Sequence, residues 1–468
     1  MILKERSEVN KITSTNLSIT ELRASLKGRV IVPGDADYDE ARMVFSGTID
    51  SRPAVIVRVA NTDDISRVVS LARETGLELA IRSGGHSGAG HGVCEGGIVL
   101  DLADMRALEI DVKGRTAWAE TGLTAGEYTA AVGAHGLATG FGDTGSVGIG
   151  GITLGGGIGF LSRKYGMTID SLLAAEVVTA DGQLMYADAN TNPDLFWAIR
   201  GGGGNFGVAS RFKFQLVEVD MVVGGMLILP ATADVIVDFV AAAEAAPEEL
   251  STIANVMIAP PMPFLPPEAH GKLIVMALIV YAGDTEAGER TLAPFRAIAT
   301  PIADMLHPMH YPKLFHPEQV GYHPKAAARM LFVNDIERSV AETILDHLKA
   351  SKASMAVTQI RVLGGAISRV PADATAFAHR TSRIMMSVAA MYQDSAENAI
   401  HEAWVTNLTS ILQQNDSGTY VNFLGDEGEE RVRAAYPGQT WKRLTAIKTR
   451  YDPTNLFRLN QNIPPVGD

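Results

Sequence analysis

A histidine beside two glycines follows a short apolar run near residue 80. Residues 82–87 read RSGGHS. Two adjacent glycines let backbone N–H groups turn toward one point, which forms a nest for an anion such as a pyrophosphate. A histidine directly after that nest could reach the ring of a bound cofactor. A surface turn with an incidental histidine is the alternative interpretation, and these six residues alone do not exclude it.

Glycine is concentrated in two further segments. Residues 145–159 read GSVGIGGITLGGGIG, and residues 201–207 read GGGGNFG. Glycine weakens helices and strands, so such runs indicate backbone that approaches something closely or adopts positive φ. Gly202, Gly204 and Gly207 match the dinucleotide spacing G-x-G-x-x-G. A strand pattern follows them instead of a helix, and no acidic residue lies about 20 positions on, so the Rossmann interpretation fails on its context.

Two other patterns could do chemistry. His307, His310, His316 and His323 lie close together among prolines. They lack a helical i,i+4 pair and an HExxH pattern, so we expect no metal and favour a loop over a substrate cavity. Residues 85–89, GHSGA, differ by one residue from the nucleophile elbow G-x-S-x-G, because Ala89 replaces the last glycine. A serine hydrolase is therefore not favoured.

Alternating strands and helices surround these segments in the first 220 residues. Apolar or alternating runs predict strands at 54–60, 78–82, 98–102, 176–187 and 208–219. Thr62 is expected to cap a helix that Gly76 ends. Thr124 and Glu127 form a capping-box pattern for a second helix. An Asp-Gly pair at 181–182 predicts a hairpin.

The pattern changes beyond residue 220. Apolar strands are predicted at 225–230 and 272–282, and alanine-rich helices at 234–246, 285–297, 340–351 and 396–414. Such an alternation is typical of an antiparallel sheet covered by helices. Residues 258–269 and 300–325 are predicted loops. A last helix is expected at 439–449, before a tail that packs on the body.

Charge and cysteine content narrow the partners. The net charge of −13 repels phosphate backbones, so we expect no nucleic acid partner. Cys94 is the single cysteine, which excludes an internal disulfide and is compatible with a reducing cytoplasm. Residues 1–14 contain no apolar run of secretory length, and no later run is long enough to span a bilayer. We therefore expect a cytoplasmic location and no membrane partner, while the oligomeric state stays open.

Taken in order, these motifs resemble one family. RSGGHS at 82–87, the glycine run at 145–159, AEVVTADG at 175–182, DLFWAIRGGGGNFGV at 194–208 and YDPTNLFRLNQNIP at 451–464 carry the resemblance. The chain resembles the berberine-bridge-enzyme-like FAD-linked oxidases of the vanillyl-alcohol-oxidase superfamily. The singly linked 6-hydroxynicotine-oxidase-like branch is the most similar in pattern. The resemblance is strong over 50–220, good over the last 50 residues and weak over 220–375.

This resemblance implies an α+β fold with three parts. Residues 1–220 would form the FAD-binding domain, 221–415 a substrate domain with an antiparallel sheet covered by helices, and 416–468 a segment that returns to the FAD-binding domain. The expected cofactor-binding residues are Arg82, Ser83, Gly84, Gly85, His86, Ser87, Thr144, Ser146, Val147, Gly148, Gly151, Gly155, Gly159, Val208, Asn460 and Asn462.

The resemblance also implies a covalent bond from His86 to the 8α carbon of the flavin. Many members add a second link from a cysteine in a C-x-x-V-G pattern, where this chain has Thr144. Cys94 lies eight residues after His86 and is not at the position of that cysteine pattern. We therefore expect an 8α-histidyl FAD without a cysteinyl link.

The family pattern breaks at the expected catalytic base. Alcohol-oxidising members place a tyrosine at the end of Y-x-N-Y, where this chain has Phe423, which accepts no proton. An alcohol must lose its O–H proton as hydride leaves, whereas a neutral amine can donate hydride without a base. The candidate bases that remain are Tyr392, Tyr420, Asp426 and His323. Tyr392 is the named catalytic candidate. It ends a strand expected after an F-x-H-R segment at 377–380, with Ser387 exposed on one face.

The expected function is FAD-dependent oxidation of a small molecule. Hydride would leave a C–H next to an amine or hydroxyl, with O2 as the expected acceptor. Apolar and aromatic residues such as Met257, Phe264, Phe315, Tyr322 and Met385 favour an aromatic or apolar substrate. A carbohydrate or alcohol oxidase of the same family and a non-catalytic flavin-binding protein are the alternatives.

Overall fold

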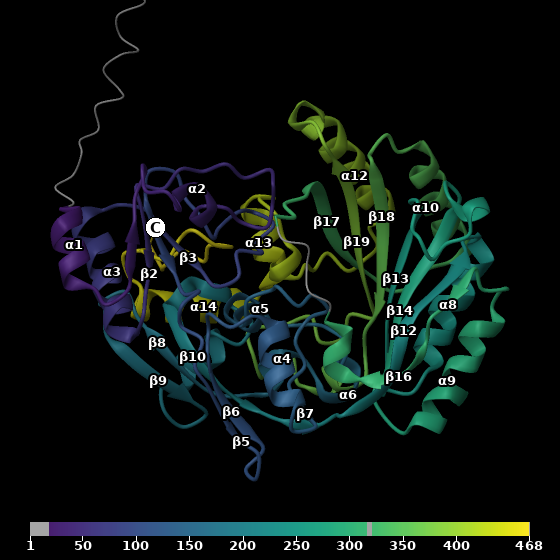
Figure 1. The fold of residues 1–468 in the computed structure, drawn as a ribbon, viewed down its shortest axis with the longest axis horizontal. Coiled ribbons are helices and arrows are strands. Elements are labelled where there is room, and N and C mark those ends of the chain that lie inside the picture. Colours follow the sequence, from purple (N-terminus) through teal and green to yellow (C-terminus); the bar gives the residue numbers. More distant parts are fainter. Residues whose placement is uncertain (1–17, 316–320, 468) are drawn as a thin grey trace, which may run out of the picture.

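Three large sheets organise the chain in the computed structural model, which describes residues 18–315 and 321–467 (Figure 1). The first has the order β1-β2-β4-β3, with bounds Arg29–Ile31, Val55–Arg58, Ile98–Asp101 and Leu79–Arg82. β4 pairs in parallel with β2 and β3, so the carboxyl ends of these strands lie at one edge. The RSGGHS segment begins at that edge, where β3 ends.

Helix α3 (Thr62–Thr75) packs on this first sheet. Asn61 caps it, because the Asn61 side chain accepts a hydrogen bond from the backbone N of Asp64 at 3.0 Å. Thr62 is the first helical residue, so the predicted cap is wrong by one position. Gly76 ends the helix with φ of 67°, as predicted. Two short helices, α1 (Ile19–Ser25) and α2 (Tyr38–Ala41), complete the N-terminal part.

The second sheet is antiparallel, with the order β5-β6-β10-β8-β9. Its strands span Leu108–Asp111, Thr116–Glu120, Val208–Gln215, Leu172–Val178 and Leu184–Asp188. Helices α4 (Ala125–Gly133), α7 (Pro193–Ala198) and α14 (Gln439–Tyr451) contribute to its core. The capping box of Thr124 and Glu127 is confirmed at the start of α4. Residues 217–218 are not part of β10 but form β11 (Val217–Glu218), which pairs with β7 (Leu137–Ala138).

The third sheet has the order β15-β12-β14-β13-β18-β19-β17, with β16 also paired to β12. These strands span Ala303–Asp304, Met221–Pro230, Leu273–Tyr281, Leu250–Ile258, Met355–Val362, Ile384–Tyr392, Lys325–Val333 and, for β16, His307–His310. Among the described residues, every strand pairing in this sheet is antiparallel. The predicted α+β class is confirmed.

Helices cover one face of the third sheet. They are α8 (Ala233–Ala245), α9 (Thr285–Ala297), α10 (Arg338–Ala350) and α12 (Asn398–Leu412). Met386, Val388 and Ala390 of β19 lie in the core under these helices. Met385 belongs to a different cluster that includes Tyr420, so the opposite face looks toward the first two sheets (Figure 1).

The C-terminal segment returns to the glycine run at 201–207. Helix α13 (Glu429–Ala435) and α14 lead into the tail. Lys448 and Asp452 are fully buried and form an ion pair of 2.7 Å. Lys448 also donates to the backbone oxygens of Asn205 at 2.8 Å and Phe457 at 2.9 Å. The Asn205 side chain accepts from the backbone N of Ile463 at 2.9 Å. These bonds join two motifs that lie far apart in the sequence.

The loop predicted over 300–325 is partly wrong. It contains the short strands β15 and β16, both of which add to the edge strand β12. Neither strand has a periodic pattern of its own, because pairing with β12 forms both and Pro308 is tolerated on an edge. Strands β13, β17 and β18 were also not predicted. Within the described ranges no helix is long and apolar enough to cross a membrane.

Candidate active site

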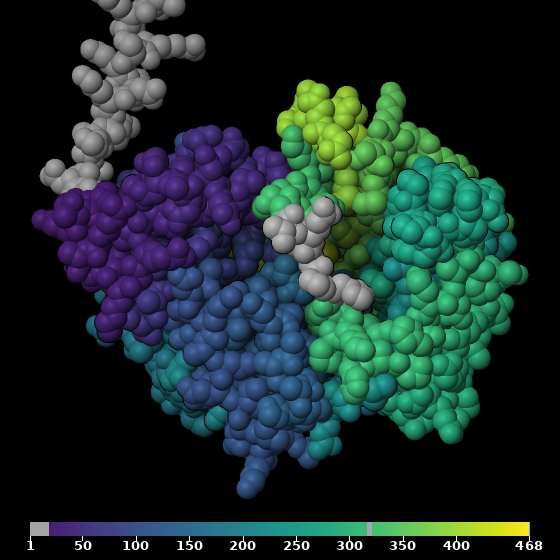
Figure 2. Space-filling view, in the orientation of Figure 1, coloured from purple at the N-terminus to yellow at the C-terminus, as the bar shows by residue number. Residues whose placement is uncertain are grey.

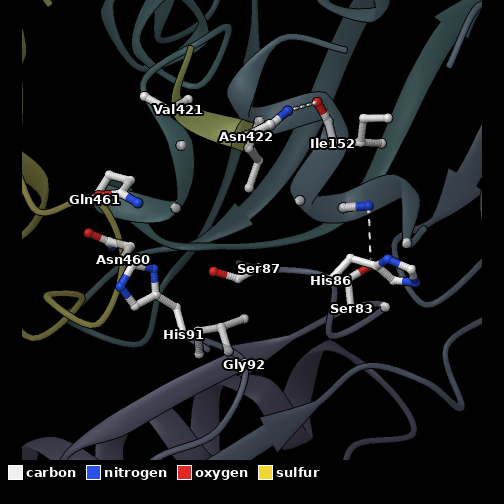
Figure 3. Close-up of a pocket in the computed structure, with 18 of the residues that line it drawn as sticks. Ser83, His86, Ser87, His91, Gly92, Ile152, Val421, Asn422, Asn460 and Gln461 are labelled. Atoms are coloured by element: carbon white, nitrogen blue, oxygen red, sulfur yellow. Dashed lines mark hydrogen bonds between the residues drawn. The ribbon is translucent and has the colours of Figure 1, made fainter. Parts of the chain in front are cut away.

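A cavity of about 480 Å³ lies between the first two sheets, the C-terminal segment and the open face of the third sheet. Figure 2 shows the surface hollowed between the purple N-terminal part and the green part of the chain. The RSGGHS segment forms one wall, the glycine runs at 142–158 and 203–209 form the next, and residues 420–424 and 457–461 close it. Figure 3 shows Ser83, His86 and Ser87 facing Asn422 across the cavity, with His91 on the side of Asn460 and Gln461.

Arg82 fixes the start of the RSGGHS segment. Its Nη2 donates to the Asp101 carboxylate at 2.8 Å and to the Ala41 oxygen at 2.5 Å, and its side chain is buried. Gly85 then has φ of 70°, a backbone conformation that favours glycine. A Cβ on Gly84 would lie 2.2 Å from the backbone N of Gly148. The glycines therefore let the two motifs cross backbone against backbone.

The His86 ring is held from two sides. A 2.9 Å hydrogen bond joins its Nε2 to Ser146 Oγ. The Phe45 ring stacks on it, with centroids 4.3 Å apart and planes 19° apart. Both contacts fix the orientation of the imidazole in the wall of the cavity.

Most of the expected cofactor-binding residues line this cavity: Arg82, Ser83, Gly84, Gly85, His86, Ser87, Thr144, Val147, Gly148, Gly151, Val208 and Asn460. The cavity lining does not include Ser146, Gly155, Gly159 or Asn462. Ser146 instead contacts His86. Gly155 and Gly159 permit close packing. A Cβ on Gly155 would lie 1.9 Å from Asn422 Oδ1, and a Cβ on Gly159 would lie 2.0 Å from the backbone oxygen of Phe141.

Tyr392, the named catalytic candidate, lies elsewhere. It ends β19 on the helix-covered face, in the core with residues of α8, α10 and α12. Its ring stacks on His401 at 4.9 Å, and its hydroxyl donates to Asn398. The structure does not bring it to the cavity, so we do not propose it as the base. The residue type was right for a base, but strand alternation places it on the wrong face.

The other candidate bases are also engaged or remote. Tyr420 lines the cavity, but its hydroxyl oxygen accepts from the backbone N of Gly157 at 2.7 Å and from Asn422 at 2.8 Å. Burial raises the pKa of Tyr420 to about 12. Asp426 is not part of the cavity lining. His323 donates to the Val44 oxygen at 2.7 Å.

His307, His310, His316 and His323 were expected to bind no metal. His307 contacts the Met305 oxygen, and His310 pairs with Asp220 at 2.7 Å. His316 lies outside the described residues. Among the residues that the structure does describe, no three His, Cys, Asp or Glu side chains gather around a point that could hold a metal.

One polar group of the cavity was not identified from the sequence. Asp143 lines the cavity, and its carboxylate accepts a hydrogen bond from Arg361 of β18 at 2.6 Å. Arg361 is 5% exposed and donates to Gln359 at 2.8 Å. Gln359 donates in turn to Asn255 of β13 at 2.9 Å. An arginine between two aliphatic residues, Ile360 and Val362, was the signal that could have identified Arg361.

Comparisons with known proteins agree with this geometry. The FAD binding domain family matches residues 53–188, and the family described as berberine and berberine like matches residues 419–464. An uncharacterized FAD-linked oxidoreductase, YvdP of Bacillus subtilis, is 31% identical, over 94% of this chain and 98% of its own. The (R)-6-hydroxynicotine oxidase of Paenarthrobacter nicotinovorans is 29% identical, over 95% of this chain and 98% of its own.

Solved structures share the fold. The 6-hydroxy-D-nicotine oxidase of Arthrobacter nicotinovorans has a TM-score of 0.85 at 26% identity, over 94% of this chain and 98% of its own. Chitooligosaccharide oxidase has a TM-score of 0.83 at 23% identity, over 95% of this chain and 98% of its own, which is a likeness of fold alone. The chain therefore belongs to the berberine-bridge-enzyme-like FAD-linked oxidoreductases of the vanillyl-alcohol-oxidase superfamily, and it is an FAD-dependent enzyme that acts on a small molecule.

Proposed function

We propose that His86 alone attaches the FAD, through a bond from its imidazole to the flavin 8α carbon. The observation that carries this proposal is the placement of His86 in the cavity wall, between Ser146 and Phe45. A ring held in one orientation loses little freedom when the bond forms. When bound, FAD accepts hydride from a substrate carbon.

The residues around the cavity fit this cofactor. The Oδ1 atom of Asn460 is buried and has no hydrogen-bond partner among the described residues, although Asn460 lines the cavity. A buried polar atom of this kind is normally satisfied, and a polar cofactor would satisfy it. Gly84 and Gly85 would let backbone N–H groups face the pyrophosphate. We propose the cavity-lining members of the expected set, with Ser146, as the cofactor-binding residues.

The proposed single attachment rests on two positions. Thr144 lines the cavity where relatives with a second link carry cysteine, and a threonine hydroxyl forms no such link. Cys94 is 3% exposed, and its thiol points to the Ile98 oxygen at 3.5 Å. Burial raises the pKa of Cys94 to about 12, so this thiol carries no nucleophilic thiolate at neutral pH.

We further propose that the enzyme oxidises a C–H next to an amine or hydroxyl of an aromatic or apolar molecule. The aromatic side chains near His86 support this class. Phe45 stacks on His86, and Tyr322, which is 44% exposed, lies edge-on to Phe45 with centroids 6.3 Å apart. Met385 packs in the same buried cluster as Tyr420, which lines the cavity. We also propose O2 as the electron acceptor and the cytoplasm as the location, which peroxide formation and cell fractionation would test.

The test of the attachment is flavin fluorescence in a denaturing gel of the purified holoprotein. We expect the wild-type band to fluoresce and His86→Ala to give a dark band. The matched control is His91→Asn, a second histidine of the cavity wall, whose band should stay fluorescent. A fluorescent His86→Ala band, or a dark wild-type band, would overturn the attachment. A panel of benzylamine, benzyl alcohol and xylose tests the substrate class through anaerobic bleaching of the flavin, which we expect from one of the two aromatic compounds.

A further inference from the structure

The oxidation of an alcohol or ammonium group needs a proton acceptor, and Phe423 supplies none. The other titratable groups of the cavity wall are engaged or, like His91, lie on the side of the cavity away from His86. Arg82 pairs with Asp101, and the proposal above commits His86 to the cofactor. Burial lowers the pKa of His91, which lies among the tail residues (Figure 3). Tyr420 accepts two hydrogen bonds and has a pKa of about 12.

Tyr436, the last titratable group of the wall, is engaged as well. It donates to the Gly201 oxygen at 3.2 Å, and burial raises its pKa. Asp143 is then the one carboxylate among the described residues that line the cavity. Its side chain is 21% exposed, so one side of the carboxylate is open to the cavity.

The position of Asp143 is fixed by its neighbours. Its Oδ2 accepts from Arg361 Nη2 at 2.6 Å, and its Oδ1 accepts from Thr144 Oγ1 at 3.2 Å. The Arg361 guanidinium lies over the Phe423 ring at 5.2 Å. Asp143 and Phe423 line the main cavity, whereas Arg361 lines a small neighbouring space. The negative end of this ion pair therefore faces the cavity that would hold the cofactor and the substrate.

We propose that Asp143 is a catalytic residue and accepts the substrate's proton, taking over the role that Phe423 cannot fill. This inference rests on the proposed function. The substrate loses a hydride from C–H to FAD, and its neighbouring O–H or N–H bond breaks with the proton passing to a carboxylate oxygen of Asp143. The electron pair left on oxygen or nitrogen completes the C=O or C=N bond. The substrate is oxidised by two electrons, and FAD is reduced by the same two.

Arg361 is a positioning residue in this account. It pairs with the ionised carboxylate, and Gln359, Asn255 and the Phe423 ring hold the guanidinium in place. Only an unprotonated carboxylate can accept the proton, so acid should slow flavin reduction in the wild type. The groups that face or share its surroundings are Arg361 from β18 and the cavity residues Arg82, His86, His91, Tyr420 and Tyr436.

The test is the holoprotein variant Asp143→Asn, which keeps the shape of the side chain and removes the proton-accepting charge. Flavin reduction is followed anaerobically by stopped flow from pH 5 to 9 with benzyl alcohol, which does not ionise in this range. Benzylamine is compared at fixed pH only, because its own ammonium group titrates. General-base catalysis typically contributes about 10²–10⁴-fold, so we expect a loss of at least about 100-fold at pH 8 and disappearance of the acid limb. The matched control, Asp238→Asn, changes an exposed carboxylate on α8, outside the cavity lining, and should keep both rate and limb.

A second readout needs no turnover. A carboxylate that faces the reacting atoms also perturbs the flavin, so its protonation should change the visible spectrum of the resting holoenzyme, and Asp143→Asn should abolish this change. An unchanged acid limb in Asp143→Asn, or the same spectral titration in variant and wild type, would overturn the proposal. Gel fluorescence of the same samples separates this outcome from failure of the His86 attachment, because Asp143→Asn should remain fluorescent.

Discussion

Removal of the Lys448 ammonium should weaken the packing of the C-terminal tail against the rest of the protein. Lys448 is 0% exposed and donates to Asp452, to the Asn205 oxygen and to the Phe457 oxygen, at 2.7, 2.8 and 2.9 Å. Lys448→Met replaces the ammonium with an apolar group of similar length. The Asp452 carboxylate then stays buried without its counter-ion, although the backbone N–H groups of Leu456 and Phe457 still donate to it, both at 2.8 Å.

The size of the effect follows from this geometry. Breaking a buried ion pair by removing one partner costs about 3–5 kcal/mol, because an uncompensated charge remains. Two carbonyl oxygens also lose a charged donor, and such hydrogen bonds contribute about 1.5–3 kcal/mol each. The two remaining N–H donors offset part of this loss. We therefore expect the free energy of unfolding to fall by about 3–5 kcal/mol.

The assay is urea unfolding of the holoprotein, followed by far-UV circular dichroism and by flavin fluorescence. Phe457, Leu459, Asn460 and Gln461 line the cavity, so the flavin signal should change at the same or a lower urea concentration than the circular dichroism. Lys442→Met is the matched control, since Lys442 is exposed on the same helix and should cost less than about 0.5 kcal/mol. Lys448→Met/Asp452→Asn should recover part of the loss. A Lys448→Met midpoint equal to that of Lys442→Met would refute the reasoning.

Three further predictions concern the cofactor loop, the second attachment point and acid stability. Gly84→Ala places a Cβ 2.2 Å from the Gly148 backbone and should cost about 1–3 kcal/mol and reduce flavin content. Gly425→Ala, which has open space and lies outside the cavity lining, should not, and equal flavin content in the two would contradict the crossing of the motifs. Thr144→Cys should create a second covalent link to the flavin, so that the FAD joins tryptic peptides 83–106 and 116–163. Recovery of the two peptides as separate species would place Thr144 away from the flavin ring. Burial lowers the pKa of His379 and His91, so the unfolded state binds more protons than the folded state below about pH 6.5, and the free energy of unfolding decreases as the pH falls. Between pH 7.5 and 5.5, His379→Gln should therefore lose less stability than the wild type. An equal loss in the two proteins would contradict this cause.

The residues that could be predicted are those whose signal is local. The RSGGHS segment, the α4 capping box and the Gly76 helix end each depend on a few consecutive residues, and the structure has these turns and caps where they were expected. The assignment to the flavin oxidases depended on several such motifs in order. None of them required knowledge of which strands pair.

The features that escaped prediction depend on tertiary contacts. Asp143 and Arg361 are 218 positions apart, and they meet only because β18 faces the glycine run at 142–158. Tyr392 was misplaced because both faces of β19 are apolar, so hydrophobic alternation could not tell the helix side from the cavity side. Strands β15 and β16 exist only as additions to β12.

The most direct test of the account is the location of the flavin on the polypeptide. Trypsin should release His86 within residues 83–106, a peptide that also contains His91 and Cys94, and Thr144 within residues 116–163. We predict one FAD on peptide 83–106, with fragmentation that assigns it to His86, and an unmodified peptide 116–163. Flavin on His91, Cys94 or peptide 116–163, or recovery of both peptides unmodified from yellow protein, would contradict the proposed attachment.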